Sequence, residues 1–231
     1  MNEYIIIIPT YNESENITQL ISSIRLPNCD LLFIDDNSPD GTSNHIKSHP
    51  KYNKNIYLIE RKNKNGYASA CKEGMQFALK KKYKYIVQMD ADLSHSGDDL
   101  NKLIKLSTSQ DLVIGSRYIP GGKTTGWGLS RVMLSKTANL FSKFYLRQKV
   151  NDLTSGFRVY NVETLNKVNL EKLQSEGYGF LVEILYNISK ITEDIEEVPI
   201  HFNDRKFGQS KMSFKIIIEA VKLVLFLPFK N

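Results

Sequence analysis

The chain has 231 residues, of which 41% are hydrophobic, so it is long enough to bury one sizeable core. Its composition argues against collagen, disorder and a repeat array. The net charge of +6 and the isoelectric point near 9.1 suit an anionic partner, which nucleic acid, phospholipid or a phosphorylated substrate would each provide. The lysine-rich residues 80–84 fit a solvated helix end and do not choose among these partners.

The cysteines and the N-terminus bear on the cellular compartment. Cys29 and Cys71 lie far apart in sequence, without a histidine in metal-ligand register, and we expect both to be buried thiols in a reducing compartment. Residues 1–4 carry no basic segment and run directly into a strand pattern, so we expect no signal peptide. The protein is therefore expected in the cytosol or facing it.

Short apolar runs alternate with helix-length segments along the chain. The runs are typical of strands buried on both faces and lie at Tyr4–Ile8, Leu31–Ile34, Ile56–Ile59, Tyr85–Met89 and Leu112–Ile114. The helical segments between them are Ile17–Ile24, which follows a helix-start pattern at Asn12–Asn16, then Ala68–Lys80 and Leu100–Leu106. This alternation predicts right-handed βαβ units and an α/β fold, with a mostly parallel central sheet flanked by helices.

A polar cluster follows four of these strands. The clusters are Pro9–Glu13, Asp35–Thr42, Asp90–Asp92 and Gly115–Tyr118. Ligands of parallel sheets bind outside the carboxyl ends of the strands, so we expect all four clusters to converge on one edge. Asp, Asn, Ser and Gly are ordinary turn formers, and any one cluster is explained equally well by a turn. Their joint occurrence at strand ends indicates a binding site.

Asp90 and Asp92 flank one alanine directly after an apolar strand. Two carboxylates this close repel each other when unpaired, and their oxygens are the hard ligands that suit Mg²⁺ or Mn²⁺ bridging a diphosphate. An Asx turn or helix cap leading into residues 98–99 would use the same spacing. No GxGxxG follows the first strand and no GxxxxGK[ST] occurs in the sequence, so a nucleotide would be held by carboxylates and metal.

Motifs along nearly the whole chain resemble one known family. They are IIPTYNE (Ile7–Glu13), DDNSPDGT (Asp35–Thr42), MDADLSH (Met89–His95), GSRYIPGG (Gly115–Gly122), GWGLSRVMLSKTAN (Gly126–Asn139), DLTSGFR (Asp152–Arg158), GYGFLVE (Gly177–Glu183) and EVPIHFNDRKFGQSKMS (Glu197–Ser213). They resemble the family 2 glycosyltransferases, which have the GT-A (Rossmann-like) fold. The segments from Gly115 to Ser213 resemble a narrower group, the dolichyl-phosphate mannose synthases and their bacterial polyprenyl-phosphate counterparts.

The resemblance implies a nucleotide and metal site in the first half of the chain. Asp90 and Asp92 would hold the metal ion, and Ser94, where family members carry Gln or Ser, would reach it through a water molecule. The side chains implied to bind the nucleotide sugar are Asp90 together with Pro9, Tyr11, Glu13 and Asp36, the last being suited to base or ribose contacts. His95 and His201 fit structural positions, and we assign neither a metal role.

The acceptor that the resemblance implies is a lipid phosphate, whose oxygen is ionised near neutral pH and needs little help from a general base. Negative charge on this phosphate and on the departing diphosphate must be stabilised by Arg, Lys and metal. At the matching positions, Arg117, Arg131 and Ser135 would bind the acceptor phosphate. The candidate catalytic residues are Asp92, Arg117 and Arg131.

The same resemblance implies a mobile loop that closes over the diphosphate. Arg205 and Lys211 would clamp the diphosphate from this loop, and Gly208 and Ser210 would let it bend. Arg158 is left off the catalytic list, because bracing Asp152 explains it as well as a contact with substrate does.

The C-terminal segment has a broad apolar surface. Residues 214–229 contain no uncharged apolar run of about 18 residues, so we expect no transmembrane helix. At ~100° per residue, Lys215, Glu219 and Lys222 fall within a narrow arc. We therefore divide the chain into a catalytic domain, 1–212, and an amphipathic helix, 213–231, which anchors at a membrane interface, seats a membrane-spanning partner or closes the core. Leu129–Leu146 can likewise touch lipid or pack on the core.

By resemblance, we expect an inverting, metal-dependent transfer of mannose from GDP-mannose to a polyprenyl (dolichyl) phosphate at the cytoplasmic face of a membrane, with Mg²⁺ or Mn²⁺ as cofactor. Two alternatives keep the fold: a UDP-glucose or UDP-N-acetylhexosamine donor, or a polysaccharide or protein acceptor with Glu183 as general base. A sugar-nucleotide-binding scaffold subunit without catalysis is a third hypothesis. Nucleic acid is not expected as a partner, because the basic residues form no aromatic-interleaved patch.

Overall fold

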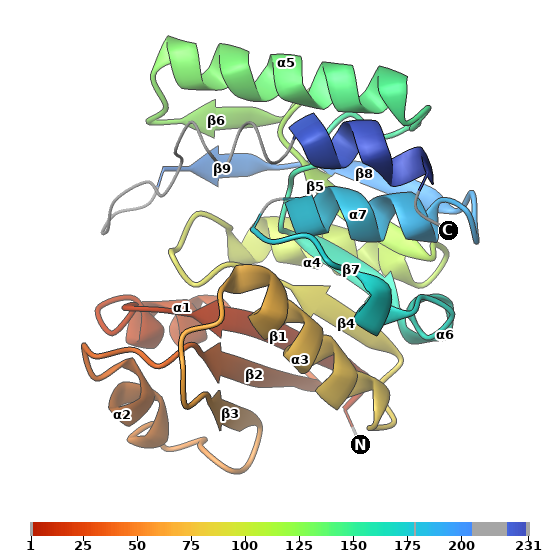
Figure 1. The fold of residues 1–231 in the computed structure, drawn as a ribbon. Helices are drawn as coiled ribbons and strands as arrows, with labels where there is room; N and C mark the ends of the chain where they lie inside the picture. The colour runs from red at the N-terminus through yellow and green to blue at the C-terminus, as the bar shows by residue number, and fades with distance from the viewer. Residues whose placement is uncertain (1, 178, 205–220, 230–231) are drawn as a thin grey trace.

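The computed structural model describes residues 2–177, 179–204 and 221–229, in which a central sheet lies between two layers of helices (Figure 1). The strand order of this seven-stranded sheet is β3-β2-β1-β4-β7-β5-β8. Its strands are β1 (Tyr4–Thr10), β2 (Cys29–Asp35), β3 (Ile56–Glu60), β4 (Tyr85–Gln88), β5 (Leu112–Ser116), β7 (Arg158–Asn161) and β8 (Ile195–Pro199). A separate two-stranded sheet pairs β6 (Lys123–Thr125) with β9 (His201–Asn203).

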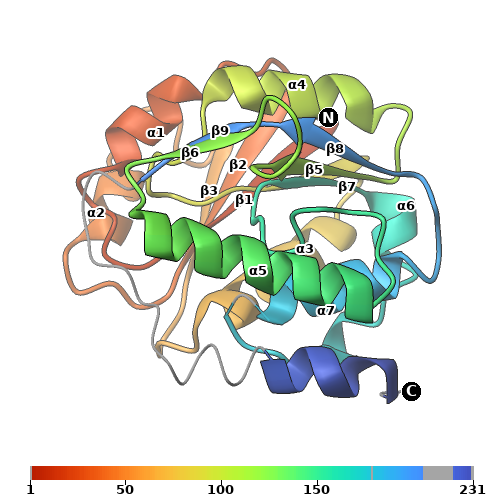
Figure 2. The ribbon, with the colours of Figure 1, turned by 90° about the horizontal axis from the view of Figure 1, so that it is seen from above.

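The helices divide between the two faces of the sheet (Figure 2). Helices α1 and α4 cover one face, whereas α3, α5, α7 and the helical residues 221–226 lie on the other. The helix bounds are α1 (Ile17–Ser23), α2 (Thr42–Lys47), α3 (Tyr67–Leu79), α4 (Gly97–Ser107), α5 (Leu129–Tyr145), α6 (Val162–Leu165) and α7 (Gly179–Ile188), with short 3-10 turns η1 (Leu170–Lys172) and η2 (Leu227–Phe229).

The predicted mostly parallel sheet is confirmed, with one exception in its middle. β1 pairs in parallel with β2 and β4, and β5 pairs in parallel with β8. β7 runs antiparallel to both of its neighbours, β4 and β5. The start of β7 therefore lies at the edge where β4 and β5 end, and this direction brings residues 152–157 to the predicted binding edge.

The strands are continuous apolar runs because both faces of the sheet are covered. Ile5 and Ile7 of β1 belong to a core cluster with residues of α3 and α7, and Ile6 and Ile8 belong to a second cluster with residues of α1 and α4. α3 approaches β1 closely at Gly74, where an added Cβ would lie 3.2 Å from Ile7. The core thus holds the sheet edge, and the loops on it, between two packed helix layers.

The C-terminal residues 221–229 pack on the core and also carry exposed apolar side chains. Val224 and Leu227 are buried in the same cluster as α7, whereas Phe226 and Phe229 are 63% and 76% exposed. The described residues include no helix that is both long enough and apolar enough to cross a membrane. The domain boundary predicted at 212/213 lies outside the described residues, as do Arg205, Gly208, Ser210 and Lys211 of the predicted clamp loop.

Candidate active site

Asp92 lies in the loop after β4 and is oriented by Ser94. Its Oδ1 accepts hydrogen bonds from the Ser94 backbone N–H at 3.1 Å and from the Ser94 hydroxyl at 2.5 Å. Leu93 between them has a φ of +63°, and this tight turn brings Ser94 back to the carboxylate. The Asx-type turn considered from the spacing is therefore present. The water-mediated metal contact of the buried Ser94 stays a prediction.

Asp90 faces a groove beside the sheet edge and contacts a tyrosine and a histidine. The Tyr67 hydroxyl donates to Asp90 Oδ1 at 3.2 Å. Burial and the nearby Asp90 charge raise the pKa of Tyr67 well above its usual range, so this hydroxyl stays protonated. His95 Nε2 lies 3.4 Å from Asp90 Oδ2, poorly aligned for a hydrogen bond, and the ring stacks on Phe157 with centroids 4.4 Å apart. This packing agrees with the structural role expected for His95.

The two carboxylates have the chemistry of a magnesium or manganese site. Mg²⁺ is usually bound by one or two protein carboxylates, with water and substrate phosphates completing its shell. Asp90 and Asp92 supply that number. Over residues 2–177, 179–204 and 221–229, no group of three or more His, Cys, Asp or Glu side chains could hold an ion without such help. The side chains therefore fit a metal ion that binds together with a diphosphate.

Asp36 anchors the loop in front of α3. This buried carboxylate accepts hydrogen bonds from Arg61 Nη1 at 2.8 Å and from the backbone N–H groups of Asn65 and Gly66 at 2.9 and 2.8 Å. Gly66 has a φ of +87°, a backbone conformation that favours glycine. The structure thus gives Asp36 a bracing role at the start of α3, and its base or ribose contact stays a prediction.

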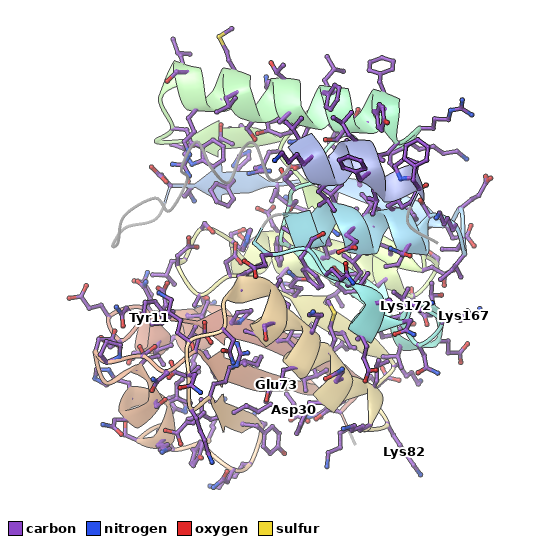
Figure 3. All side chains as sticks on the ribbon, viewed as in Figure 1. Tyr11, Asp30, Glu73, Lys82, Lys167 and Lys172 are labelled. Atoms are coloured by element: carbon purple, nitrogen blue, oxygen red, sulfur yellow. The ribbon has the colours of Figure 1, made fainter. Side chains whose placement is uncertain are left out.

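The loops after β1 and β2 are tied to each other, as expected if their polar clusters converge. The Glu13 N–H donates to Thr42 Oγ1 at 3.0 Å, and the Glu13 carboxylate accepts from Asn16 Nδ2 at 2.7 Å. Lys64 Nζ lies 3.5 Å from the centroid of the Tyr11 ring. Pro9 precedes these residues and is half-buried. Tyr11 lies at the carboxyl-end edge of the sheet, opposite the exposed lysines Lys82, Lys167 and Lys172 (Figure 3).

Arg117 is held by Asp152 in a buried ion pair. Its Nε and Nη2 donate to the two carboxylate oxygens, each at 2.7 Å, and its backbone N–H donates to the same group at 3.0 Å. The arginine and aspartate side chains are 7% and 0% exposed. This bidentate geometry fixes Arg117 firmly. Its predicted contact with an acceptor phosphate is untested, and any such contact has to be made by a guanidinium already bound to Asp152.

Arg131 and Ser135 lie on α5 and face the groove. The Arg131 guanidinium stacks 3.9 Å from the centroid of the Trp127 ring, and its Nη1 donates to Asp204 at 3.3 Å. Arg117 lies 5.4 Å from the same ring centroid, so Trp127 brings the two predicted phosphate ligands to one place. The Ser135 hydroxyl accepts a hydrogen bond from Tyr118 at 2.6 Å.

One groove connects the carboxylates to an apolar end. Asp90 and Asp92 line it beside Arg117, Arg131 and Ser135. Its apolar wall comes from α5, α7 and the C-terminal segment: Leu134, Ala138, Phe141, Val182, Val221, Leu223 and Val224. The phenolic hydroxyl of Tyr145 on α5 also donates to the Leu225 carbonyl at 3.0 Å, which joins two of these elements. The groove can therefore hold a ligand with a charged head and an apolar tail.

The sequence did not predict several residues of the groove, and the structure changes the expectations for Arg158 and Glu183. Tyr67, Trp127 and Asp204 line the groove, and Asp152 braces Arg117 beside it. The motifs that contain Trp127, Asp152 and Asp204 were the available signal, whereas Tyr67 lies in none of them. Arg158 does not brace Asp152, because its guanidinium donates to the carbonyls of Ser155, Leu181 and Leu153 at 2.7–2.9 Å. Glu183 is buried in α7 and accepts from the Ser175 N–H at 2.8 Å.

The architecture and the paired carboxylates define a GT-A glycosyltransferase, and comparison with known proteins agrees. Residues 5–168 match the model of Glycosyl transferase family 2. The chain belongs to this family, as its motifs predicted. It is 38% identical over 217 residues to the undecaprenyl-phosphate mannosyltransferase of Micrococcus luteus, covering 93% of this chain and 89% of that one. It is 37% identical over 221 residues to the polyprenol monophosphomannose synthase of Mycolicibacterium smegmatis, covering 94% and 83%.

Solved structures show the same fold at lower sequence identity. Glucosyl-3-phosphoglycerate synthase from Mycobacterium tuberculosis, in complex with phosphoglyceric acid, superposes with a TM-score of 0.71 at 15% identity over 100% of this chain and 81% of that one. The same enzyme with Mn²⁺, uridine diphosphate and glucosyl-3-phosphoglycerate gives a TM-score of 0.70 at 16% identity, over 97% and 79%. These likenesses confirm the predicted fold class.

Proposed function

We propose that this glycosyltransferase transfers mannose from GDP-mannose to a polyprenyl phosphate, with inversion at the sugar and release of GDP. The observation that carries the proposal is the groove that starts at Asp90 and Asp92, passes Arg131 and ends among apolar side chains. The two relatives named for mannose transfer to lipid phosphates support it, because each is matched over more than nine-tenths of this chain. A lipid phosphate has the charged head and apolar tail that the groove suits.

The protein residues would act mainly by orientation and charge. An oxygen of the acceptor phosphate attacks the anomeric carbon, the bond from that carbon to the diphosphate breaks, and no proton needs to leave the attacking oxygen. Asp90 and Asp92 would hold Mg²⁺ or Mn²⁺, which stabilises negative charge on the departing diphosphate when bound. Arg131 would bind the acceptor phosphate from α5, with Ser135 beside it. Arg117, fixed by Asp152, adds positive charge to the same end of the groove.

The apolar surface around the groove supports attachment to a membrane, and the proposal places the protein on the cytoplasmic face. The exposed side chains include Leu129, Met133, Leu140 and Phe144 on α5, and Phe226 and Phe229 in the C-terminal segment. Because α5 and this segment also form the apolar wall of the groove, a lipid could enter directly from the surface they contact. A membrane-spanning partner subunit seated on these side chains is part of the same proposal.

The alternative acceptors find less support. A polysaccharide or protein hydroxyl needs a carboxylate base at the groove, but Glu183 lies in the core and is bound to the Ser175 N–H. UDP-linked donors would use the same carboxylates, so the choice of mannose as the donor sugar depends on the two mannosyltransferase relatives. A sugar-nucleotide-binding scaffold would use the carboxylates, but it would not need the arginine pair beside an apolar groove.

A donor panel tests the sugar. Purified protein is incubated with a polyprenyl phosphate, Mn²⁺ and one of GDP-mannose, UDP-glucose or UDP-N-acetylglucosamine, and labelled lipid is extracted. Turnover of GDP-mannose alone is expected. If UDP-glucose is turned over and GDP-mannose is not, the mannose assignment is refuted and the reaction class stands. If no donor is turned over, the result favours the non-catalytic scaffold.

A pair of variants tests the acceptor. Arg131→Ala should lower kcat/KM for the lipid phosphate by about a hundredfold, because it removes a charge-assisted contact worth ~2–3 kcal/mol. Glu183→Gln should keep most of the activity in protein that is still folded. The reverse pattern would favour a hydroxyl acceptor activated by Glu183.

A further inference from the structure

The Asp90 carboxylate is closely packed against two residues, Tyr67 and Gly156, to which the proposed reaction gives no role. One side of this Asp90 niche is the Tyr67 hydroxyl, 3.2 Å from Oδ1. Another side is Gly156, where an added Cβ would lie 2.7 Å from the Tyr67 hydroxyl and 3.4 Å from Asp90 Oδ1. The glycine thus leaves room for the phenol and the carboxylate to meet. A larger residue at 156 would push them apart.

The Tyr67 hydroxyl is itself oriented by two buried residues. Gln88 Nε2 donates to the Tyr67 oxygen at 2.8 Å, and Gln88 Oε1 accepts from the Tyr160 hydroxyl at 2.9 Å. Both Gln88 and Tyr160 are fully buried. Because an amide N–H can only donate, the Tyr67 oxygen accepts from it, and the single phenolic proton is directed to Asp90. The polar chain therefore runs in one direction, from Tyr160 through Gln88 and Tyr67 to Asp90.

We propose that Tyr67 is a positioning residue that fixes the orientation in which Asp90 presents its carboxylate to the metal ion. Tyr67 would not touch the ion; it would act through Asp90, with Gln88 and Tyr160 holding its hydroxyl in place. Partners of this kind, hydrogen-bonded to a ligating carboxylate, typically change metal affinity by about 10–100-fold when removed. The inference rests on the proposed metal role of Asp90.

Manganese binding tests the inference directly. Mn²⁺ is titrated into the full chain in the presence of GDP, and free Mn²⁺ is measured by its electron paramagnetic resonance signal. Tyr67→Phe keeps the ring and removes only the hydroxyl, and it should weaken Mn²⁺ binding by about tenfold. The matched control is Tyr57→Phe on the edge strand β3, which removes a hydroxyl that donates to the Lys54 carbonyl and should leave Mn²⁺ binding unchanged. GDP binding without metal should be the same in all three proteins.

Gln88→Met provides a second test in case Tyr67→Phe misfolds, and Asp90→Asn distinguishes the positioning role of Tyr67 from the metal role of Asp90. If Tyr67→Phe does not fold, Gln88→Met removes the group that orients the phenol and should weaken Mn²⁺ binding in the same direction. Wild-type Mn²⁺ affinity in folded Tyr67→Phe, or in Gln88→Met when it replaces that variant, overturns the inference. Asp90→Asn reports on the metal role: if it weakens binding and Tyr67→Phe does not, the inference alone fails. If Asp90→Asn binds Mn²⁺ like wild type, the metal role fails and the inference fails with it.

Discussion

The candidate active site has a donor half and an acceptor half, so called for their proposed roles, and the two are built in different ways. The donor half lies at the ends of β1, β2 and β4, which are neighbouring parallel strands, and its loops are tied by hydrogen bonds such as that from the Glu13 N–H to Thr42. The acceptor half, around Arg117 and Arg131, depends on side-chain pairs between distant segments. Arg117 and Asp152 are 35 residues apart, and Arg131 and Asp204 are 73 apart.

The two halves therefore differ in what positions their functional side chains. In the donor half the sheet itself places the carboxylates, because parallel strands end at one edge. In the acceptor half each arginine is held by an acidic partner, and both guanidinium groups lie near the Trp127 ring. We therefore expect donor-half substitutions to affect chemistry with little loss of stability, and substitution of the buried partner in the acceptor half to affect stability first.

The largest expected effect is on the chemistry of the donor half. Asp92→Ala should lower kcat by at least about a thousandfold, ~4 kcal/mol, because the charge of the departing diphosphate loses its metal counter-charge. Initial rates at saturating Mn²⁺ measure this. Asp98→Ala, at an exposed position in the first turn of α4, is the control and should keep the rate. An active Asp92→Ala protein would refute the metal role.

In the acceptor half, Asp152→Ala should destabilise the fold by about 3 kcal/mol or more, because it leaves the buried Arg117 guanidinium without its counter-ion. Urea unfolding of both proteins gives the difference. The exposed pair Lys149–Glu193 provides the control, and Glu193→Gln should produce no measurable change. Equal unfolding midpoints for Asp152→Ala and wild type would mean that the arginine does not depend on this partner.

A smaller effect is expected at the apolar rim of the acceptor half. Phe144 on α5 is 74% exposed, and Phe144→Ser should weaken binding to vesicles of phosphatidylglycerol and phosphatidylcholine by about fivefold, ~1 kcal/mol. Co-sedimentation measures the bound fraction. Ile191→Ser changes an exposed apolar residue in the turn after α7 and should not alter binding. The same loss in both variants would point to a general surface effect instead of a docking face.

A further prediction concerns stability at alkaline pH and lies at the start of β2, at the sheet edge opposite the candidate active site. Burial raises the pKa of the Cys29 thiol from 9.0 to about 12, so between these values the thiol ionises only in the unfolded chain. The unfolded state then binds fewer protons, and stability falls as pH rises; at about pH 10 this thiol accounts for ~1.4 kcal/mol. Cys29→Ala should reduce the fall in unfolding free energy between about pH 8 and 10 by that amount. An unchanged slope would contradict it.

The sequence predicted the donor half better than the acceptor half for a physical reason. Uninterrupted apolar runs such as Tyr4–Ile8 indicate buried parallel strands, and the edge rule then places whatever follows them. That reasoning could not reveal that β7 runs antiparallel, which brings Gly156 to Asp90 from the opposite chain direction. Nor could residue types alone show that Asp152 pairs with Arg117 instead of Arg158, because tertiary packing decides which guanidinium reaches it.

Chain order also keeps the two halves apart. The strand-end loops and the α3 start of the donor half lie before residue 96, whereas Arg117, Arg131, Asp152 and the apolar wall all come later, and the second half of the chain meets Asp90 at Gly156. A single exchange of sequence between two related enzymes, made after α4, would replace Arg117, Arg131, Asp152 and the apolar wall together and leave the strand-end loops and Asp90 in place. The end of α4 is therefore a natural point for recombination that changes acceptor preference, provided that the incoming segment also supplies Gly156 and Tyr160 of the Asp90 niche and the predicted diphosphate clamps Arg205 and Lys211.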